Sequence, residues 1–308
     1  MTTVTITPSG PFSLAASVRF LEGFTPASYD DAADGTLRLA FPADDGHATV
    51  AAAVRQDEPT DDGAGAVRVD FAVQSDGGEE PSTEAVRNQI ARILSLDVDG
   101  AGFPALATDP VVAGLMADYA GLRPVCFYSP YEAAAWAIIG QRVRMTQAAA
   151  VKAHIAERHG SPVRVAGRTL HAFPGPQALL ELTHVPGLTD VKVERLHALA
   201  DAAADGELDA AKLRAKPVDD ALTALRAVPG IGPFSAELVL IRGAGHPDVF
   251  PLHERRLHAS MADEYGLDTS EADDVPRLAG IADRWRPYRS WVALLLRARA
   301  EDRGAAHH

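Results

Sequence analysis

Cysteine is almost absent from this sequence, because Cys126 is the only one among 308 residues. A single cysteine excludes an internal disulfide, a Cys-rich zinc finger and a four-cysteine iron–sulfur cluster, and it suits the reducing cytoplasm. No apolar run reaches the roughly 18 residues that a membrane-spanning helix needs. No positive charge precedes the first apolar stretch, so a signal peptide is not expected. We therefore expect a cytoplasmic chain, and nothing in the sequence implies a membrane, a cofactor, a resident metal or a protein partner.

Lysine is also scarce, and positive charge comes mainly from arginine. The net charge of −13 at first argues against a nucleic-acid partner. Residues 1–100, however, contain 6 Lys and Arg against 17 Asp and Glu, whereas residues 101–308 are close to neutral. The acidity is therefore confined to the first third, and the remainder keeps arginines that can contact phosphates. The four lysines are Lys152, Lys192, Lys212 and Lys216.

The first hundred residues have the pattern of a mixed α+β region. Large apolar residues alternate with polar or small ones over 67–74, which is the two-residue period of a half-buried strand. Further strands are predicted at Phe12–Phe20, Thr36–Phe41 and His47–Val54, and acidic, Gly-rich turns separate several of them. A helix is predicted from Glu84 to Leu96, with its apolar residues on one side.

Beyond residue 105 the pattern is helical, and strand signals nearly vanish. Ser129, Pro130 and Glu132 occupy the N-cap, N1 and N3 positions of a capping box. The segment that follows is apolar almost all round, which predicts one long central helix up to about Arg158, ended by Gly160. Further helices are predicted at 176–184, 190–204 and 217–227.

The most informative segment joins two short helices through Val228-Pro229-Gly230-Ile231-Gly232. Glycines permit positive φ and close approach of another backbone, and Ile231 between them can fill the core below. Pro233 then opens a second helix, and Gly243 is the predicted C′ stop. The N–H groups at such a helix start favour an anion, for example a DNA phosphate. The alternative is a plain helix–helix turn that uses Pro-Gly as punctuation.

The helix-hairpin-helix of the base-excision DNA glycosylase superfamily (HhH-GPD) has the pattern L-P-G-[IV]-G-x-x-[ST]-A, which the segment LRAVPGIGPFSAELVLIRG resembles. Three other segments are similar to the 3-methyladenine DNA glycosylase II (AlkA-like) branch, namely SPYEAAAWAIIGQRVRMTQAAAVKA, FPGPQALLELTHVPGLTDVKVERLHALADA and DRWRPYRSWVALLL. The resemblance implies an α+β chain of two domains. A TATA-box-binding-protein-like α/β domain is expected at 1–104, and an all-α glycosylase region at 105–308, with the hairpin at 218–243.

Enzymes of this superfamily flip a damaged nucleotide out of double-stranded DNA and cleave its glycosidic bond through an oxocarbenium-like transition state that a carboxylate stabilises. The family places an Asp 22 residues beyond the second hairpin glycine. That position is Glu254 here. The resemblance therefore implies a base-excision repair enzyme with Glu254 as its catalytic residue. Two alternatives stay open: a weakly catalytic or non-catalytic DNA-damage-binding protein on the same scaffold, and an α+β protein unrelated to DNA.

Residue type alone favours a different interpretation of Glu254, as an exposed helix residue that pairs with Arg255, Arg256 or His258. Only its register in the family motif argues for catalysis. The neighbouring His253 is a weaker candidate, either as a polar helix cap or as a second group that handles protons.

Bifunctional members of the superfamily place a Lys two residues after the second hairpin glycine, where this sequence has Phe234. No lysine follows Lys216, so a Schiff base from the downstream region is impossible. The resemblance therefore implies a hydrolase of N-glycosyl bonds without lyase activity at abasic sites.

The base pocket departs from the family pattern. By register, Phe234 retains an aromatic ring, whereas Leu238, Arg255 and Arg297 stand where the branch has aromatic residues. Stacked rings attract a cationic alkylated base and arginines oppose it, so the lesion stays undecided between alkylated and neutral bases. The tryptophans are expected in the core rather than in the pocket.

The family also implies roles outside the pocket. Gln141 lies in the central-helix motif, and Arg142 after it is in register with the residue that fills the gap left by the flipped base; its alternative is a solvated arginine. DNA phosphate is expected at the hairpin, and a monovalent cation can bind the hairpin carbonyls. The hairpin residues are Val228, Gly230, Ile231 and Gly232.

Overall fold

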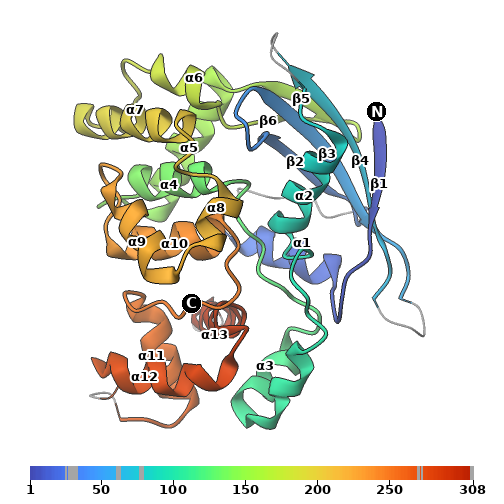
Figure 1. Cartoon of the computed structure of the whole chain (residues 1–308), viewed down its shortest axis with the longest axis vertical. Helices are drawn as coiled ribbons and strands as arrows, with labels where there is room; N and C mark the ends of the chain where they lie inside the picture. Colours follow the sequence, from blue (N-terminus) through green and yellow to red (C-terminus); the bar gives the residue numbers. More distant parts are fainter. Residues whose placement is uncertain are drawn as a thin grey trace.

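The computed structural model describes residues 1–24, 26, 34–59, 64–75, 80–268, 271 and 273–305. An N-terminal sheet with two helices lies beside a larger helical body, as Figure 1 shows. None of the described helices is both long enough and apolar enough to cross a membrane.

The N-terminal sheet has four antiparallel strands in the order β1-β4-β3-β2. The alternation predicted over 67–74 is confirmed, because the side chains of Val67, Val69 and Phe71 are buried on one face. Helices α1 and α2 cover that face and share its core. The predictions near residues 36–41, 47–54 and 84–96 are also confirmed, whereas β1 was not predicted because most of its residues are exposed or half-buried. The bounds are β1 (Thr2–Ile6), α1 (Leu14–Gly23), β2 (Leu37–Pro42), β3 (Ala48–Gln56), β4 (Val67–Ser75) and α2 (Thr83–Ile93).

The predicted strand at Phe12–Phe20 is wrong, because this segment forms α1. The Ser13 side chain accepts a hydrogen bond from the Ala16 N–H (3.1 Å) and so caps the helix N-terminus. The buried side chains Leu14, Val18 and Leu21 follow the helical spacing i, i+4 and i+7. When an apolar run fits both the helical and the strand period, the helix cap and the packing against the sheet therefore determine which element forms.

The helical body surrounds α4 (Pro130–Ile139), in which nine of ten residues are buried as predicted. The Ser129 side chain accepts the Glu132 N–H (3.1 Å), which confirms the predicted N-cap. Helices α5, α6, α7, α8, α9 and α10 share a core with α4. Their bounds are α5 (Met145–His159), α6 (Pro176–Leu180), α7 (Asp190–Ala204), α8 (Ala210–Ala215), α9 (Val218–Ala227) and α10 (Pro233–Leu238).

The predicted single helix up to Arg158 is also wrong, because α4 ends at Ile139 and a turn over 140–144 separates it from α5. The Lys192 ammonium of α7 donates to the terminal carbonyls of Ile139 (2.7 Å) and Gln141 (2.8 Å). A cation at the C-terminus of a helix satisfies unpaired carbonyls and complements the helix dipole. Gly140, a poor helix former, is the C-cap of α4, and the Lys192 contact stabilises the break that begins there.

Strands reappear beyond residue 105, contrary to prediction. The β-hairpin formed by β5 (Pro162–Val165) and β6 (Arg168–His171) packs on the opposite face of the N-terminal sheet, against Ala40, Ala51 and Ala53. Small alanines on that face let the hairpin approach closely, so the sheet is covered on both sides (Figure 1).

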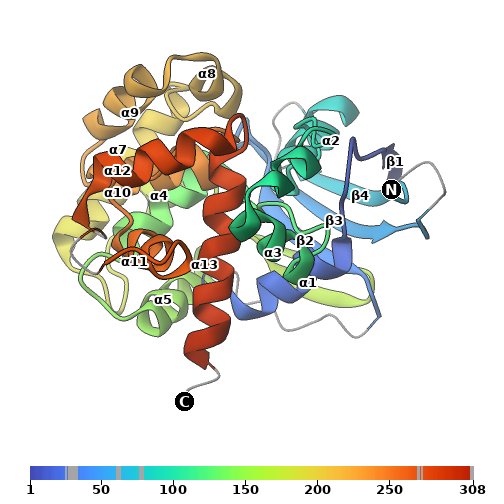
Figure 2. The ribbon, with the colours of Figure 1, turned by 90° about the horizontal axis from the view of Figure 1, so that it is seen from below.

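A third core joins the C-terminal helices to α3, and Figure 2 shows α13 running alongside α3 and α11. Trp285 and Trp291 are fully buried in this core, and Trp136 is buried in α4, which confirms the prediction for the tryptophans. The remaining elements are η2 (Phe103–Thr108), α3 (Pro110–Asp118), η3 (Val239–Gly243), α11 (Arg255–Glu264), α12 (Val275–Ala282), η5 (Asp283–Trp285) and α13 (Arg289–Ala305).

Candidate functional site

The hairpin forms between α9 and α10 as predicted. Gly230 has φ +92°, which requires glycine, whereas Gly232 has the ordinary extended values φ −87° and ψ 179°. Ile231 is buried in the body core, and its N–H donates to the Val228 carbonyl (3.0 Å). The first backbone bond of α10 runs from the Ala236 N–H to the Gly232 carbonyl, so the N–H groups before it are available to an external acceptor.

The predicted stop at Gly243 is wrong by two residues. Gly243 lies inside η3, a π-helical turn that continues α10, and Gly245 takes the left-handed conformation with φ +73°. A Cβ at Gly243 would lie 2.7 Å from the Pro130 Cα, so this glycine allows close packing of the turn against α4.

The turn between α4 and α5 is hydrogen-bonded to the hairpin. The Gln141 side chain donates to the Gly230 carbonyl (2.5 Å) and accepts from Arg195 of α7 (2.7 Å). Arg142 follows with φ +55° and an exposed side chain. The structure thus brings Gln141 and Arg142 beside the hairpin, on a turn where the helix that was predicted to carry them is interrupted.

Glu254 is half-buried and is the N-cap of α11. One carboxylate oxygen, Oε1, accepts the Arg256 N–H (3.2 Å), while Oε2 has no hydrogen-bond or ion-pair partner among the described residues. Within the part of the chain that the structure describes, the carboxylate makes no ion pair with Arg255, Arg256 or His258, the pairing considered from residue type alone. His258 is instead buried and bonds to the Pro251 carbonyl (2.9 Å).

A second carboxylate connects this segment to the hairpin. Glu237 of α10 is buried, with 2% of its surface exposed. It accepts the N–H groups of Leu252 and His253 (3.0 Å each) and bonds to Nδ1 of His253 (2.7 Å). Sequence reasoning missed Glu237, although a lone carboxylate among the apolar residues of the segment FSAELVL was an available signal.

The chain is similar in sequence to known DNA glycosylases. The chain is 26% identical over 234 residues to the DNA-3-methyladenine glycosylase of Bacillus subtilis, a match that covers 74% of this chain and 76% of the relative. It is 30% identical over 212 residues to a probable bifunctional transcriptional activator/DNA repair enzyme AlkA of Mycobacterium tuberculosis, covering 65% of this chain but 40% of that protein. No known protein-family profile matches the chain.

The fold agrees with these matches. The 3-methyladenine DNA-glycosylase of Archaeoglobus fulgidus superposes with a TM-score of 0.73 at 22% identity, covering 96% of this chain and 97% of that one. At 22% identity this likeness shows the fold alone. The assignment to one branch of the glycosylases rests on the sequence relatives. The sequence relatives support the assignment of this chain to the helix-hairpin-helix DNA glycosylase superfamily, in its AlkA-like branch.

The residues in register with the superfamily's base pocket differ in how exposed they are and in which residues they contact. Phe234 is 46% exposed at the start of α10, and Leu238 is partly buried against the body core. The Arg255 side chain is 89% exposed and lies 3.9 Å from Asp273. Arg297 pairs with Glu301 (2.6 Å) one turn along α13. Their membership of one pocket stays a prediction.

Most of the large exposed apolar side chains in the described chain lie on the hairpin or near the segments that are hydrogen-bonded to it, directly or through Gln141, namely the 140–144 turn, α7 and the loop before Glu254. Leaving Met1 aside, they are Met145 after the 140–144 turn, Val191 near the start of α7, Phe234 in the hairpin and Leu252 before Glu254. Exposed apolar residues that gather on connected segments indicate a contact surface. The connecting hydrogen bonds are those of Gln141 and Glu237 described above.

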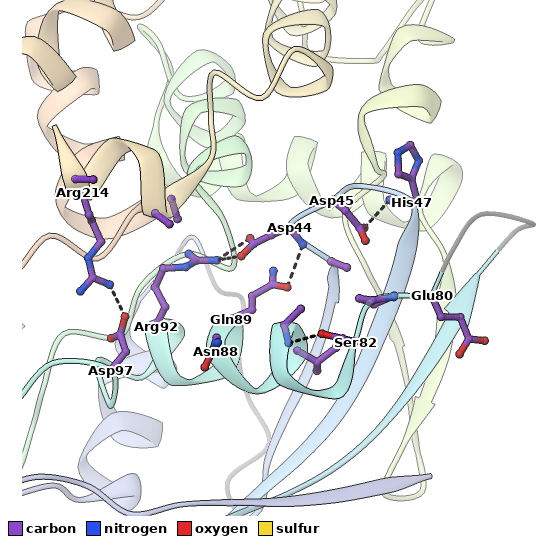
Figure 3. Close-up of a pocket in the computed structure, with 17 residues that line it drawn as sticks. Asp44, Asp45, His47, Glu80, Ser82, Asn88, Gln89, Arg92, Asp97 and Arg214 are labelled. Carbon is purple, nitrogen blue, oxygen red and sulfur yellow. Dashed lines mark hydrogen bonds and ion pairs between the residues drawn. The ribbon is translucent and has the colours of Figure 1, made fainter.

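A hollow of about 890 Å³ lies elsewhere, between α2, α8 and the β2–β3 turn (Figure 3). Asp44, Asp45, Glu80 and Asp97 line it, and the two arginines of its wall pair with Asp44 and Asp97. None of the site residues predicted from the superfamily lines this hollow. The carboxylates of Asp45 and Glu80, which make no ion pair among the described residues, disfavour a polyanion there.

The hairpin carbonyls are compatible with the monovalent cation that the superfamily implies. The Gly230 carbonyl accepts from Gln141 and the Val228 carbonyl from Ile231, and each carbonyl oxygen has a second lone pair. Among the described residues, no group of three or more His, Cys, Asp or Glu side chains is arranged to hold a metal ion.

Proposed function

We propose that this protein is a monofunctional DNA glycosylase of base excision repair, which flips a damaged base out of double-stranded DNA and hydrolyses its N-glycosidic bond. One observation carries the proposal: the segment that ends in Glu254 is hydrogen-bonded, through Glu237, to the second helix of the hairpin. If the hairpin holds a phosphate of the DNA backbone, this connection therefore fixes the position of the Glu254 carboxylate relative to the same DNA strand. Residues 1–104 are assigned to the TATA-box-binding-protein-like domain and 105–308 to the glycosylase region.

Glu254 has the chemistry that the reaction requires. Cleavage of the glycosidic bond builds positive charge on the sugar, and a fixed carboxylate stabilises that charge and can orient the attacking water. Oε1 is held by the Arg256 N–H, which orients the side chain and leaves Oε2 for the sugar or the water. The backbone contact reduces the freedom that the extra methylene of Glu adds over Asp.

The contact surface for DNA combines the hairpin, the 140–144 turn and the loop before Glu254. The hairpin N–H groups suit a phosphate without reading the sequence. The acidic N-terminal region is not expected to follow the phosphate backbone, so binding is expected to be modest and to weaken with salt. The Bacillus subtilis relative is named a DNA-3-methyladenine glycosylase, and we propose alkylated bases as the first substrates to test.

Arg142 is proposed to fill the gap that the flipped base leaves. Its positive φ and exposed side chain support an outward projection from a turn that is anchored beside the hairpin. We expect Arg142→Ala to reduce both affinity for lesion-containing duplex and single-turnover base release by about fivefold, since stacking of one side chain contributes on the order of 1 kcal/mol. Unchanged affinity and unchanged release would remove Arg142 from this role.

The absence of lysine after Lys216 predicts that strand cleavage does not follow base release. Incubation with lesion-containing DNA and borohydride is expected to give no covalent protein–DNA adduct. A trapped adduct, with nicking at the abasic product, would show a lyase and would require an amine upstream of the hairpin, either one of the four lysines or the N-terminal amine.

The function itself is tested by measuring free-base release across duplexes that contain 3-methyladenine, 7-methylguanine, hypoxanthine or uracil. Release of at least one base supports the proposal, and the pattern identifies the lesion. Salt-dependent binding to abasic-site DNA without release of any base would instead support a damage-binding protein on the same scaffold.

A further inference from the structure

The carboxylate of Glu237 is buried in the hairpin helix, and no cation from Lys or Arg pairs with it in the described chain. A buried carboxylate is stable only when its oxygens accept enough hydrogen bonds. Glu237 accepts two backbone N–H groups at 3.0 Å and faces Nδ1 of His253 at 2.7 Å. All of these partners belong to Leu252 and His253, the two residues directly before Glu254.

The loop that carries Glu254 is held at two places. At its far end, Asp248 pairs with Arg289 (2.7 Å), and the Val249 N–H donates to the Ser290 hydroxyl (3.0 Å), so that end is fixed to α13. At its near end, Glu237 is the described side chain that ties the loop to α10. The distance between the hairpin and Glu254 therefore depends on the Glu237 contacts.

We propose that Glu237 is a positioning residue, which sets the Glu254 carboxylate relative to the phosphate-binding hairpin. This inference rests on the proposed function. The chain from hairpin to carboxylate is short: Glu237 lies five residues after Gly232, and its hydrogen-bond partners lie one and two residues before Glu254. Both oxygens of Glu237 are used, so an amide at this position leaves an NH₂ group facing an N–H donor.

The test compares wild type with Glu237→Gln in single-turnover base release and in affinity for abasic-site DNA. We expect release to slow about tenfold, because small misplacement of a catalytic group is costly, while affinity changes less than threefold. Hydrogen exchange of the Leu252 and His253 amides is expected to speed up. His253→Ala removes only the side-chain contact and is expected to have a smaller effect than Glu237→Gln.

Glu132→Gln is the matched control, because Glu132 is equally buried in the same helical body but pairs with Lys152, away from Glu254. Glu132→Gln is expected to lower the stability of the fold. It is not expected to slow base release while affinity for abasic-site DNA is kept, which is the pattern expected of Glu237→Gln. Wild-type release by Glu237→Gln overturns the inference, as do equal losses of release and affinity. If wild type releases no base from any lesion, the proposed function fails. Hydrogen exchange then tests the Glu237 contact by itself: unchanged exchange of the Leu252 and His253 amides in Glu237→Gln overturns the positioning contact, and faster exchange supports it.

Discussion

Replacing Glu254 with Gln is expected to slow single-turnover release of a damaged base by about 100-fold, a typical cost of removing one pre-positioned group that stabilises charge in the transition state. Gln has nearly the same shape, and its side-chain oxygen can still accept the Arg256 N–H that Glu254 now accepts at 3.2 Å. The substitution therefore removes the negative charge while the helix cap remains. The loss should appear in the chemical step rather than in binding.

Affinity for abasic-site DNA and the thermal midpoint of unfolding are expected to stay close to wild type in Glu254→Gln. Asp274→Asn is the matched control, because Asp274 caps the next helix, α12, by accepting the Arg277 N–H (3.1 Å). It removes the same charge from the same kind of cap, and base release should remain within about twofold, since Asp274 is outside the proposed site. Equal release by Glu254→Gln and wild type would remove Glu254 from the mechanism.

Helices with a clear period and a local cap could be predicted from the sequence. The structure has α7 over Asp190–Ala204, the range predicted, and α4 begins at the Ser129 cap. The break between α4 and α5 was missed although Gly140, a poor helix former, is the C-cap of α4 and offered a local signal. Lys192 and Gln141 also form contacts that only the folded chain brings together.

The site was predictable to the extent that it follows a sequence register. The hairpin and Glu254 could be located by counting along the chain, and the structure gives Glu254 one fixed and one open oxygen. The contact of Glu237 with Leu252 and His253 could not be predicted, because it joins a helix to a loop 15 residues away. Hydrogen bonds that decide where a carboxylate lies are tertiary, and a register in one segment does not contain them.

The two hairpin glycines are expected to respond in opposite ways to alanine. Gly230 has φ +92°, and a Cβ there would lie 2.7 Å from the Arg195 Cδ, so Gly230→Ala is strained in its backbone and crowded. We expect a loss of about 1–3 kcal/mol in the free energy of unfolding. Displacement of Arg195 would also disturb its bond to Gln141, and so the turn that carries Arg142.

Gly232 has an ordinary extended backbone, and a Cβ there meets no atom within 4 Å. Gly232→Ala should therefore keep or slightly raise stability, since it restricts the unfolded chain. Nothing within the described protein requires glycine at this position, whereas the proposed DNA phosphate at the start of α10 would need the space that a Cβ takes. We expect affinity for abasic-site DNA, measured at fixed salt, to fall more than tenfold, or about 1.4 kcal/mol. A Gly232→Ala protein that is stable and binds DNA like wild type would show that the hairpin does not hold the phosphate, and the position of Glu254 would then need another explanation.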